Sequence, residues 1–568
     1  MNSTKQTTRS VASSKNAYGQ YFTPSTIAEF MLTLSGADTS SRVLEPCSGE
    51  GVFLRVLRER GFTNVTAYEI DPQLASTIDF VRCESFVSAA FDHAFDVIIG
   101  NPPYIRWANL EEELKSELAN NELWQKYCNS LCDYLSIFLL KSVELLAEGG
   151  SLVFICPEYW FSTTNAAPIR DFMIAHGYFE QIYSFNETPI FSNVTISTVI
   201  FQYRKCCFGA KADTISIAKY NARQKLTAEQ LESLRLRKEL SDVEYLVIPQ
   251  FKAHQRWVLV EETVQKAFRQ FEAMCVVKNG EAKPMQLFTA EAVESKRVTI
   301  GDVCDIGNGL VSGLDKVFQV HDTQLQEEEK AHLLNVIKAK DLQPFFFEKT
   351  TSYIFLPEGL NDREFREYFP NMYAHLQPYK STLDARYRYN REIPYWEWVF
   401  PRNLSLFRRR EPRIFVPCKE RISHKKYFRF ALVEAGLYPT QDVTALLRKP
   451  ATQESIEYIT AFLNNWRVFE WLRYHGIVKG NIVEFSEKPL ASIPFRMIDW
   501  QNITEIQLHD EITTLCKEYI QTKQASALQA IEERFDQLFI ISHQQHTENH
   551  EYRRFNGGHF QRTKCLFR

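Results

Sequence analysis

The sequence lacks a long hydrophobic run, a paired cysteine motif and a large excess of charge of either sign. No apolar run reaches the ~18 residues needed to span a bilayer. The polar segment Met1–Ser14 has no apolar core of the kind found in secretory signals. The 12 cysteines form no Cys-x-x-Cys pair, so we expect no metal site. These absences predict a cytoplasmic protein with reduced thiols.

The net charge of −4 does not indicate a nucleic-acid partner. Any DNA-binding site must therefore be a local basic patch on a nearly neutral surface. The length of 568 residues predicts more than one domain, because single hydrophobic cores rarely grow past about 250–300 residues.

Short β-like runs alternate with helical stretches from Gln20 to about Tyr203. Strands are expected at Arg42–Leu44, Val65–Ile70, Asp96–Ile99, Ser151–Ile155 and Thr195–Tyr203. Helices are expected at Ser25–Ser35, Gly51–Arg60, Asp133–Leu146 and Ala167–His176. This alternation predicts an α/β fold with a doubly wound sheet, which binds ligands at the carboxyl ends of its strands.

Changes in composition divide the chain into segments. These are a disordered N-terminus (1–17), an α/β domain (18–221), a helical connector (222–297), a mixed α+β domain (298–542) and a polar tail (543–568). The connector has helical stretches near Leu226–Leu240 and Glu261–Met274, and it could equally be a further part of the first domain. A helical stretch, Ile503–Leu538, closes the last domain. The tail contains three histidines that we expect to be solvated: His543, His546 and His550.

Residues Val43–Leu54 (VLEPCSGEGVFL) place a Gly-rich turn between an apolar strand and a helix. Glycines let the backbone pass close to a ligand, but no Gly-Lys-Ser/Thr is present, which excludes a phosphate-binding P-loop. Glu45 and Glu50 would repel a pyrophosphate and suit a ligand that carries an ammonium and a sulfonium group. Glu69 ends the next strand, where an acid can accept both ribose hydroxyls; alternatively, it caps a helix.

Residues Asp96–Ile105 (DVIIGNPPYI) end a buried strand in Asn-Pro-Pro-Tyr. Two successive prolines fix φ and remove two N–H donors, which makes a stiff loop with free carbonyls. The Asn101 side-chain oxygen and the Pro102 carbonyl could both accept from one NH₂ group, while the Tyr104 ring stacks on a base. The alternative is an ordinary turn with tyrosine at the surface. Phe191 is either a second stacking ring or a core residue.

In this order the motifs resemble those of the gamma class of amino-group DNA methyltransferases of restriction–modification systems, of which the TaqI methyltransferase is typical. They are the leading motif Gly19–Pro24, the cofactor motifs Glu45–Gly51 and Glu69–Pro72, the catalytic motif Asn101–Tyr104 and the base-stacking motif Pro189–Phe191. The resemblance covers about residues 18–203. It implies an S-adenosylmethionine-dependent methyltransferase (Rossmann-like) doubly wound sheet over 18–221 and a mixed α+β target-recognition domain for double-stranded DNA over 298–542.

The resemblance implies which residues bind S-adenosylmethionine. They are Tyr21, Thr23, Glu45, Gly49, Glu69, Ile70, Glu84, Phe86 and Pro103. Tyr21 and Thr23, with Glu45, would hold the methionine end. Glu69 would bind the ribose. Glu84 stands one residue off the register usual in the family, whereas Phe86 fits.

The implied activity is methyl transfer to N6 of an adenine that is rotated out of the duplex. The implied catalytic residues are Asn101, Pro102, Tyr104 and Phe191. The asparagine that opens the tetrapeptide favours adenine over cytosine. The resemblance also implies a bacterial or archaeal enzyme that protects host DNA from a cognate restriction endonuclease, which it need not bind. Because one chain carries both halves, we expect it to work as a monomer.

The predicted DNA-binding half contains a basic, aromatic segment. Between Lys380 and Arg429 there are 14 Lys or Arg and five acids, an excess of nine, with Tyr387, Tyr389, Tyr395, Trp396, Trp398 and Phe400 among them. Lys and Arg can neutralise phosphates and read base edges; the alternatives are a solvated face and aromatic core. Gly307–Gly309 and Ser312-Gly313 could approach a DNA backbone, or they form an ordinary loop.

Three other functions compete with this one. A methyltransferase acting on protein glutamine or RNA could share the Asn-Pro-Pro-Tyr loop, but it would lack the leading motif and the basic, aromatic half. A bifunctional restriction enzyme needs a nuclease domain, and only about 17 residues precede the first motif. A non-catalytic DNA-binding protein would not need the intact catalytic positions.

Overall fold

The computed structural model describes most of the chain. The described ranges are 21–186, 188–191, 197–209, 211–222, 224–275, 297–321, 325–388, 391–422, 425–479 and 481–551. The predicted disordered segment 1–17, the first two residues of the leading motif, Tyr389, the three tail histidine side chains and residues 552–568 lie outside this description. The chain divides into two compact units at Gln265/Lys266, with Val478–Asn481 grouped with the first unit.

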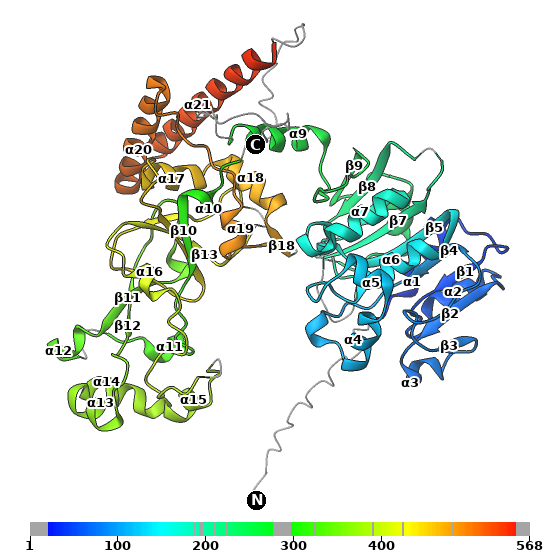
Figure 1. The fold of residues 1–568 in the computed structure, drawn as a ribbon, viewed down its shortest axis with the longest axis horizontal. Coiled ribbons are helices and arrows are strands. Elements are labelled where there is room, and N and C mark those ends of the chain that lie inside the picture. The colour runs from blue at the N-terminus through cyan, green and yellow to red at the C-terminus, as the bar shows by residue number, and fades with distance from the viewer. Residues whose placement is uncertain are drawn as a thin grey trace, which may run out of the picture. The chain divides into compact units, whose positions relative to one another are not determined.

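The first unit contains, among the described residues, a nine-stranded sheet in the order β3-β2-β1-β4-β5-β7-β6-β8-β9 (Figure 1). The strands are β1 (Val43–Glu45), β2 (Val65–Glu69), β3 (Val81–Cys83), β4 (Phe95–Gly100), β5 (Leu146–Pro157), β6 (Gly177–Ser184), β7 (Thr198–Lys205), β8 (Thr214–Tyr220) and β9 (Val243–Pro249). The first five strands of this order (β3, β2, β1, β4 and β5) pair in parallel with their neighbours. Strand β7 pairs antiparallel with both β5 and β6. The predicted doubly wound sheet is confirmed.

The strand order reverses between β1 and β4. The chain runs outward from β1 to β2 and β3, then returns to place β4 on the other side of β1. In a doubly wound sheet this reversal opens a crevice at the carboxyl ends of the strands. The residues that follow β1, β2 and β4 therefore meet at one edge.

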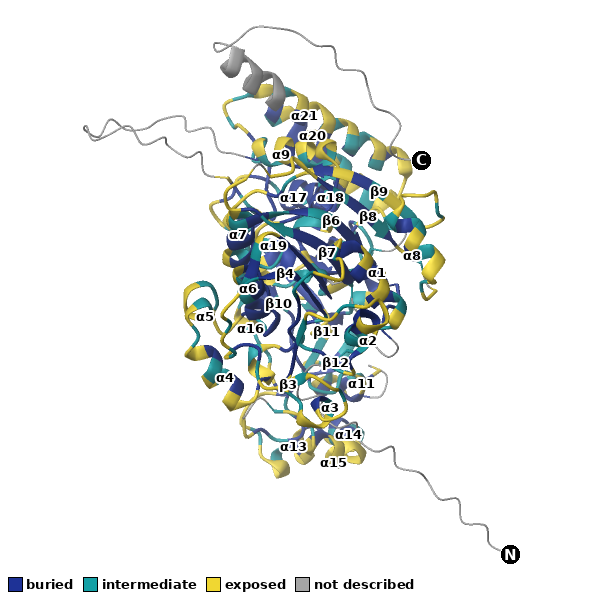
Figure 2. Ribbon diagram, turned by 90° about the vertical axis from the view of Figure 1, so that its right-hand side faces the viewer, coloured by how far each residue is buried: buried dark blue, intermediate teal, exposed yellow. Residues whose placement is uncertain are grey.

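Helices cover both faces of this sheet. They are α1 (Ser25–Ser35), α2 (Val52–Glu59), α3 (Pro72–Ala75), α4 (Glu112–Ala119), α5 (Glu122–Tyr127), α6 (Leu135–Leu145), α7 (Ala167–His176) and α8 (Ala228–Arg235). Val97 and Ile99 pack with α1, α2 and α8, whereas Ile98 packs with α6 and α7 on the opposite face. Successive side chains of a strand point to opposite faces, so β4 is apolar and buried except at Asp96, which is partly exposed (Figure 2).

The segment expected as a helical connector, 222–297, divides between the two units. Its first helix is α8, and β9 then pairs antiparallel with β8, which extends the first sheet. Helix α9 (Glu262–Ala273) begins where the chain passes to the second unit. The sequence analysis did not predict β9. It lies in a charged region, and only two of its seven residues are buried.

Among its described residues, the second unit contributes strands to three small sheets. Its strands are β10 (Cys304–Asn308), β11 (Leu333–Ile337), β12 (Thr351–Ile354), β13 (Arg413–Pro417), β14 (Lys419–Arg421), β15 (Ala431–Val433), β16 (Tyr438–Pro439), β17 (Val443–Arg448) and β19 (Ile482–Glu484). Strand β18 (Ile477–Lys479) falls mostly on residues that are grouped with the first unit. The sheet orders are β10-β17-β13-β15, β12-β11-β16 and β14-β19-β18. Short strands interrupted by loops match the irregular texture of the sequence.

Helices complete the second unit. They are α10 (Ile300–Val303), α11 (Asp315–Phe318), α12 (Glu327–Lys330), α13 (Asp362–Tyr368), α14 (Pro370–Leu376), α15 (Lys380–Asp384), α16 (Leu404–Phe407), α17 (Ile456–Leu463), α18 (Trp466–His475), α19 (Glu487–Ala491), α20 (Ile503–Thr522) and α21 (Ala525–Glu551). The predicted closing helical stretch is a pair, α20 and α21, and α21 continues into the expected polar tail. Across the described residues, every helix is too short or too polar to span a bilayer.

The Gly-rich stretch at the start of this unit has a packing role. A Cβ on Gly309 would lie 2.1 Å from the carbonyl oxygen of Thr440, and a Cβ on Gly307 would lie 2.9 Å from a methyl group of Leu406. The Gly309 N–H also donates to the Val443 carbonyl. These contacts require glycine for close backbone packing, which supports the ordinary structural alternative.

Gly309→Ala is expected to lower the free energy of unfolding by about 3 kcal/mol, the upper end for overpacking, because a backbone oxygen blocks the new methyl group. The measurement is denaturant unfolding followed by tryptophan fluorescence. Gly359→Ala is the control, since nothing lies within 4 Å of its Cβ position and only left-handed backbone strain of about 1 kcal/mol opposes it. Equal losses in the two variants would contradict the packing role.

Candidate functional site

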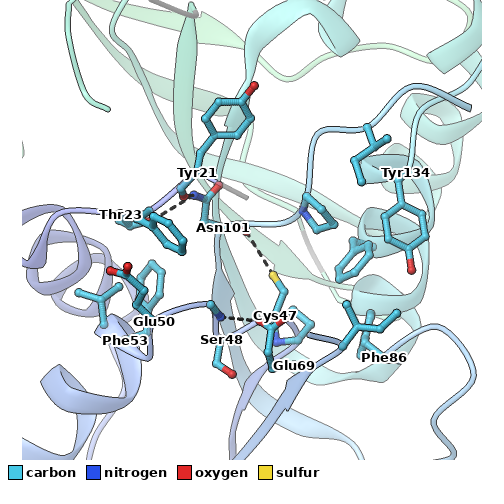
Figure 3. Close-up of a pocket in the computed structure, with 18 of the residues that line it drawn as sticks. Tyr21, Thr23, Cys47, Ser48, Glu50, Phe53, Glu69, Phe86, Asn101 and Tyr134 are labelled. Atoms are coloured by element: carbon cyan, nitrogen blue, oxygen red, sulfur yellow. Dashed lines mark hydrogen bonds between the residues drawn. The ribbon is translucent and has the colours of Figure 1, made fainter. Parts of the chain in front are cut away.

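A pocket of about 810 Å³, including space open to solvent, lies at the carboxyl ends of β1, β2 and β4 (Figure 3). Many of the residues predicted from the sequence line it: Tyr21, Thr23, Gly49, Glu69, Ile70, Phe86, Asn101 and Pro103. The crevice expected from the strand order is therefore a pocket, and the predicted motifs converge on it.

Glu45 ends β1 and is fully buried, and neither of its carboxylate oxygens has a hydrogen-bond partner. Burial raises the pKa of Glu45 well above its usual value, and the nearby Glu69 carboxylate adds to the effect. Glu45 itself does not line the pocket, whereas the next residues along the chain, from Pro46 to Glu50, do. A buried carboxylate without a partner is costly, so this position suits a ligand with a positively charged group.

Glu69 connects the two cofactor motifs. Its carboxylate accepts from the Gly49 N–H at 2.7 Å and from the Asp71 N–H at 2.9 Å. Burial raises the pKa of Glu69, and these backbone hydrogen bonds act in the opposite direction. Asp71, not Glu69, caps helix α3, by accepting from the Gln73 N–H. The helix-cap alternative therefore does not explain Glu69.

The register after β3 differs from the expectation. Glu84 is exposed and is not among the pocket-lining residues, whereas Ser85 and Phe86 are. The one-residue offset in the sequence was the signal for this difference. Ser85, rather than Glu84, is therefore the polar residue of this segment that lines the pocket.

Lys141 on α6 holds the segment that follows Phe86. Its ammonium donates to the carbonyl oxygens of Phe86, Val87 and Ala89 at 2.7, 2.8 and 2.6 Å. Burial lowers the pKa of Lys141 to about 8. Sequence patterns did not identify this residue, because its contacts join segments about 50 residues apart.

Asn101 follows β4, and hydrogen bonds to both its side-chain nitrogen and its side-chain oxygen fix the orientation of the amide. Its amide nitrogen donates to the carbonyl of Tyr21 at 2.6 Å and to the hydroxyl of Thr23 at 3.1 Å. Its side-chain oxygen accepts from the Tyr104 hydroxyl, which lies 3.0 Å from a second acceptor, the carbonyl of Ile155. The leading motif thus fixes which way the Asn101 oxygen points.

Two more contacts shape this loop. The Cys47 thiol, which the sequence analysis did not select, lines the pocket and donates to the Asn101 carbonyl at 3.2 Å. Pro102 is buried and does not line the pocket, whereas Pro103 does. The two prolines therefore face different surroundings.

Three aromatic rings gather beside Asn101. The Tyr21 ring stacks on Tyr104 with centroids 5.3 Å apart and lies 5.7 Å from the ring of Phe191. Figure 3 shows the Tyr21 ring on the other side of Asn101 from Glu69 and Phe86. Phe191 is buried against the α1 side of the sheet. The Tyr21 ring thus faces the predicted stacking residues rather than the predicted cofactor residues.

Much of the basic segment in the second unit is structural. Arg413 is fully buried and donates to the carbonyls of Phe407 and Arg409. Other cations bind carbonyls or acids: Arg386, Arg388, Arg391, Arg402, Arg409, Lys425 and Arg429. Six further cations of the segment are exposed, and Lys380, Arg421 and Lys426 among them also interact with neighbouring groups: Lys380, Arg408, Arg410, Lys419, Arg421 and Lys426. The predicted basic patch is thus smaller than the sequence count suggested.

The aromatics of this segment divide in the same way. Tyr395, Trp396 and Trp398 belong to the buried core of the second unit. Tyr387 and Phe400 are exposed. The core alternative therefore holds for the first three.

The chain is similar to known methyltransferases along most of its length. The type II methyltransferase M.HindII of Haemophilus influenzae is 47% identical over 93% of this chain and 99% of its own length. M.HincII of Haemophilus influenzae is 44% identical over the same shares. The family described as Eco57I restriction-modification methylase matches residues 26–191. A solved structure of the type IIL restriction-modification enzyme MmeI with DNA matches 91% of this chain and 72% of its own with a TM-score of 0.57; at 12% identity, this similarity is one of fold.

Lys141→Met is expected to weaken binding of S-adenosylmethionine about tenfold, because three carbonyls beside the pocket lose their donor. Isothermal titration calorimetry measures the affinity. Because the pKa of Lys141 lies at about 8, the wild-type affinity should decline as the pH rises through that value, and the variant should not show this decline. Lys205→Met, which removes similar bonds to the carbonyls of Glu144 and Leu146, should bind like wild type. An unchanged affinity in Lys141→Met would contradict the role.

Arg413→Met and Arg410→Met separate structural from exposed cations. Arg413→Met should lower the free energy of unfolding by about 3 kcal/mol, because buried carbonyls lose their donors. Arg410→Met should change it by less than about 0.5 kcal/mol and reduce the slope of log affinity for DNA against log salt by about 0.9. Thermal unfolding and fluorescence anisotropy at several salt concentrations provide the two readouts. Similar effects of both variants on stability would refute the division.

Proposed function

We propose, from the premise that the chain belongs to the type II methyltransferases of restriction–modification systems, that it methylates N6 of an adenine in double-stranded DNA. It is a DNA methyltransferase, and its cofactor is S-adenosylmethionine. The observation that carries the adenine proposal is the oriented Asn101 side chain at the end of β4, beside the cofactor pocket.

The pocket suits S-adenosylmethionine. Glu45 has two partnerless oxygens in a buried position, and the amino group of the methionine end is a matching cation. Glu69 is held by two backbone N–H groups in a position to accept the ribose hydroxyls. Gly49 lets the backbone approach the ligand, and Ile70 and Phe86 pack on the adenine ring. When bound, the cofactor supplies a sulfonium-activated methyl group.

The target amine would be received by Asn101 and Pro102. An exocyclic amine is a weak nucleophile, because its lone pair is delocalised into the ring. Two acceptors, the Asn101 side-chain oxygen and the Pro102 carbonyl, would hold its two N–H groups and turn its lone pair toward the methyl donor. The Tyr104 hydroxyl, which now donates to Asn101, can donate to Ile155 instead.

The extruded base would be held by aromatic rings. Extrusion costs a few kcal/mol, and stacking in the pocket offsets part of that cost. Tyr104 would stack on the base and Phe191 would close the opposite side. We assign the Tyr21 ring to this base site, since it contacts both rings, and we assign the Tyr21 carbonyl and the Thr23 hydroxyl to the orientation of Asn101.

The second unit would supply the DNA contacts. Its six exposed cations in the segment Lys380–Arg429 suit phosphates, within the proposed target-recognition domain, 298–542. We propose that the protein acts as a monomer, in the cytoplasm where its DNA substrate lies, and that it protects this DNA from a cognate endonuclease without needing to bind it.

Transfer of a labelled methyl group from S-adenosylmethionine to DNA, RNA and protein tests the proposal. The expected result is label in DNA only, recovered by nucleoside mass spectrometry as N6-methyladenine. Label in N4-methylcytosine would overturn the choice of base, and label in RNA or protein alone would overturn the substrate.

Asn101→Ala is expected to reduce the methylation rate by about 10²–10³-fold, the loss typical for one group that stabilises developing charge in a transition state. Binding of S-adenosylmethionine should change little, since Asn101 acts on the target amine. Single-turnover kinetics and calorimetry measure the two effects. A rate close to wild type would contradict the proposed mechanism.

A further inference from the structure

Glu158 lies beside the ends of three strands of the nine-stranded sheet in the first unit. It follows β5 directly, and β5 pairs with β7, which in turn pairs with β6. The connection from β6 to β7 begins after Ser184, ends before Thr198 and carries Phe191. Glu158 therefore stands beside both ends of the connection that holds the proposed second stacking ring.

The Glu158 carboxylate joins those two ends. One of its oxygens accepts from the Ser184 hydroxyl at 3.0 Å and from the Ser197 hydroxyl at 3.1 Å. The backbone N–H of Glu158 also donates to the Ser197 carbonyl at 3.0 Å. One residue thus makes three hydrogen bonds to the positions where the chain leaves β6 and enters β7.

These bonds add to the backbone hydrogen bonds that join β6 and β7. The Phe185 N–H donates to the Thr198 carbonyl at 2.9 Å, which joins the end of β6 to the start of β7. Beyond it, the Thr188 hydroxyl and N–H bond to Tyr220 and Phe185. Glu158, which directly follows a third strand, bonds to both ends of the connection.

Burial and nearby polar groups act on the Glu158 carboxylate in opposite directions. Burial raises the pKa of Glu158, while the two serine hydroxyls and the charge of Lys219 on β8 act in the opposite direction. Hydrogen bonds to a charged group contribute more than neutral ones, about 1.5–3 kcal/mol. Glu158 is not among the residues that line the cofactor pocket, so cofactor binding does not account for it.

Phe191 needs a fixed position to act on a base. Its ring is 4% exposed and contacts the Tyr21 ring, which contacts Tyr104. Ordering a flexible segment costs conformational entropy, and pre-organised segments avoid that cost when they bind. A clamp at the ends of the Phe191 connection would supply this order before the base arrives.

We propose that Glu158 is a positioning residue for base capture, which acts through Ser184 and Ser197 on the placement of Phe191. This role rests on the proposed methylation of an extruded base. Glu158 does not touch the cofactor pocket, and it holds the connection from which the second stacking ring projects.

The test compares four variants with wild type: Glu158→Ala, Glu158→Gln, Phe191→Ala and the double variant Glu158→Ala/Phe191→Ala. Sequencing of methylated bases first locates the target adenine. The readouts are kcat/KM for DNA methylation, the fluorescence of a duplex with 2-aminopurine at the target position, and calorimetric affinity for S-adenosylmethionine. Glu180→Ala is the matched control, because Glu180 pairs with Arg204 between the same two strands, away from the ends that Glu158 contacts.

Glu158→Ala should lower kcat/KM for DNA about tenfold, as expected for the loss of charged hydrogen bonds, and diminish the 2-aminopurine signal. Its affinity for S-adenosylmethionine should be unchanged. Glu158→Gln, which keeps an acceptor oxygen, should recover most of the activity, and Glu180→Ala should match wild type. The double variant should be no worse than Phe191→Ala, since both changes act through one ring.

Two results would overturn the proposal: wild-type base capture in Glu158→Ala, or a double variant whose loss is the product of the two single losses. Both results leave methylation by the wild-type protein intact and so would not affect the proposed function. A wild-type protein that neither methylates DNA nor changes the 2-aminopurine signal would instead overturn the proposed function, and the role of Glu158 with it.

Discussion

The hydrogen bonds that fix the Asn101 side chain are the constraint on which the site depends. The Tyr21 carbonyl and the Thr23 hydroxyl hold the amide nitrogen, so the oxygen can point in only one direction. This arrangement needs the leading motif, the end of β4 and the core beneath both. A segment before the first helix and a strand about 80 residues later thus build one acceptor.

The strand order explains why cofactor and target sites lie side by side. The reversal between β1 and β4 opens the sheet edge, and the chain uses the two sides of Asn101 differently. Glu69 and Phe86 lie on the proposed cofactor side, and the aromatic rings lie on the other. The proposed sites for the methyl donor and for the target base therefore lie on opposite sides of Asn101.

Local motifs made the family, the sheet and many pocket residues predictable, because a strand, a turn and a helix are each specified by adjacent residues. Features that depend on distant contacts were not predictable. The Tyr21 ring direction, the Lys141 bonds and the burial of Arg413 arise only once separate segments meet. Charge counts in the sequence likewise could not distinguish a cation that binds carbonyls from one that faces solvent. The roles assigned to the site residues remain predictions.

The central claim is that the Asn101 and Pro102 oxygens receive one exocyclic amine. The most direct measurement is an experimental structure of the protein with substrate DNA and a cofactor analogue. The account predicts an extruded adenine whose amine nitrogen lies within roughly 3.2 Å of both oxygens. The Tyr104 hydroxyl should then donate to the Ile155 carbonyl instead of to Asn101. A target base that stays stacked in the duplex, or an amine directed away from Asn101, would contradict it.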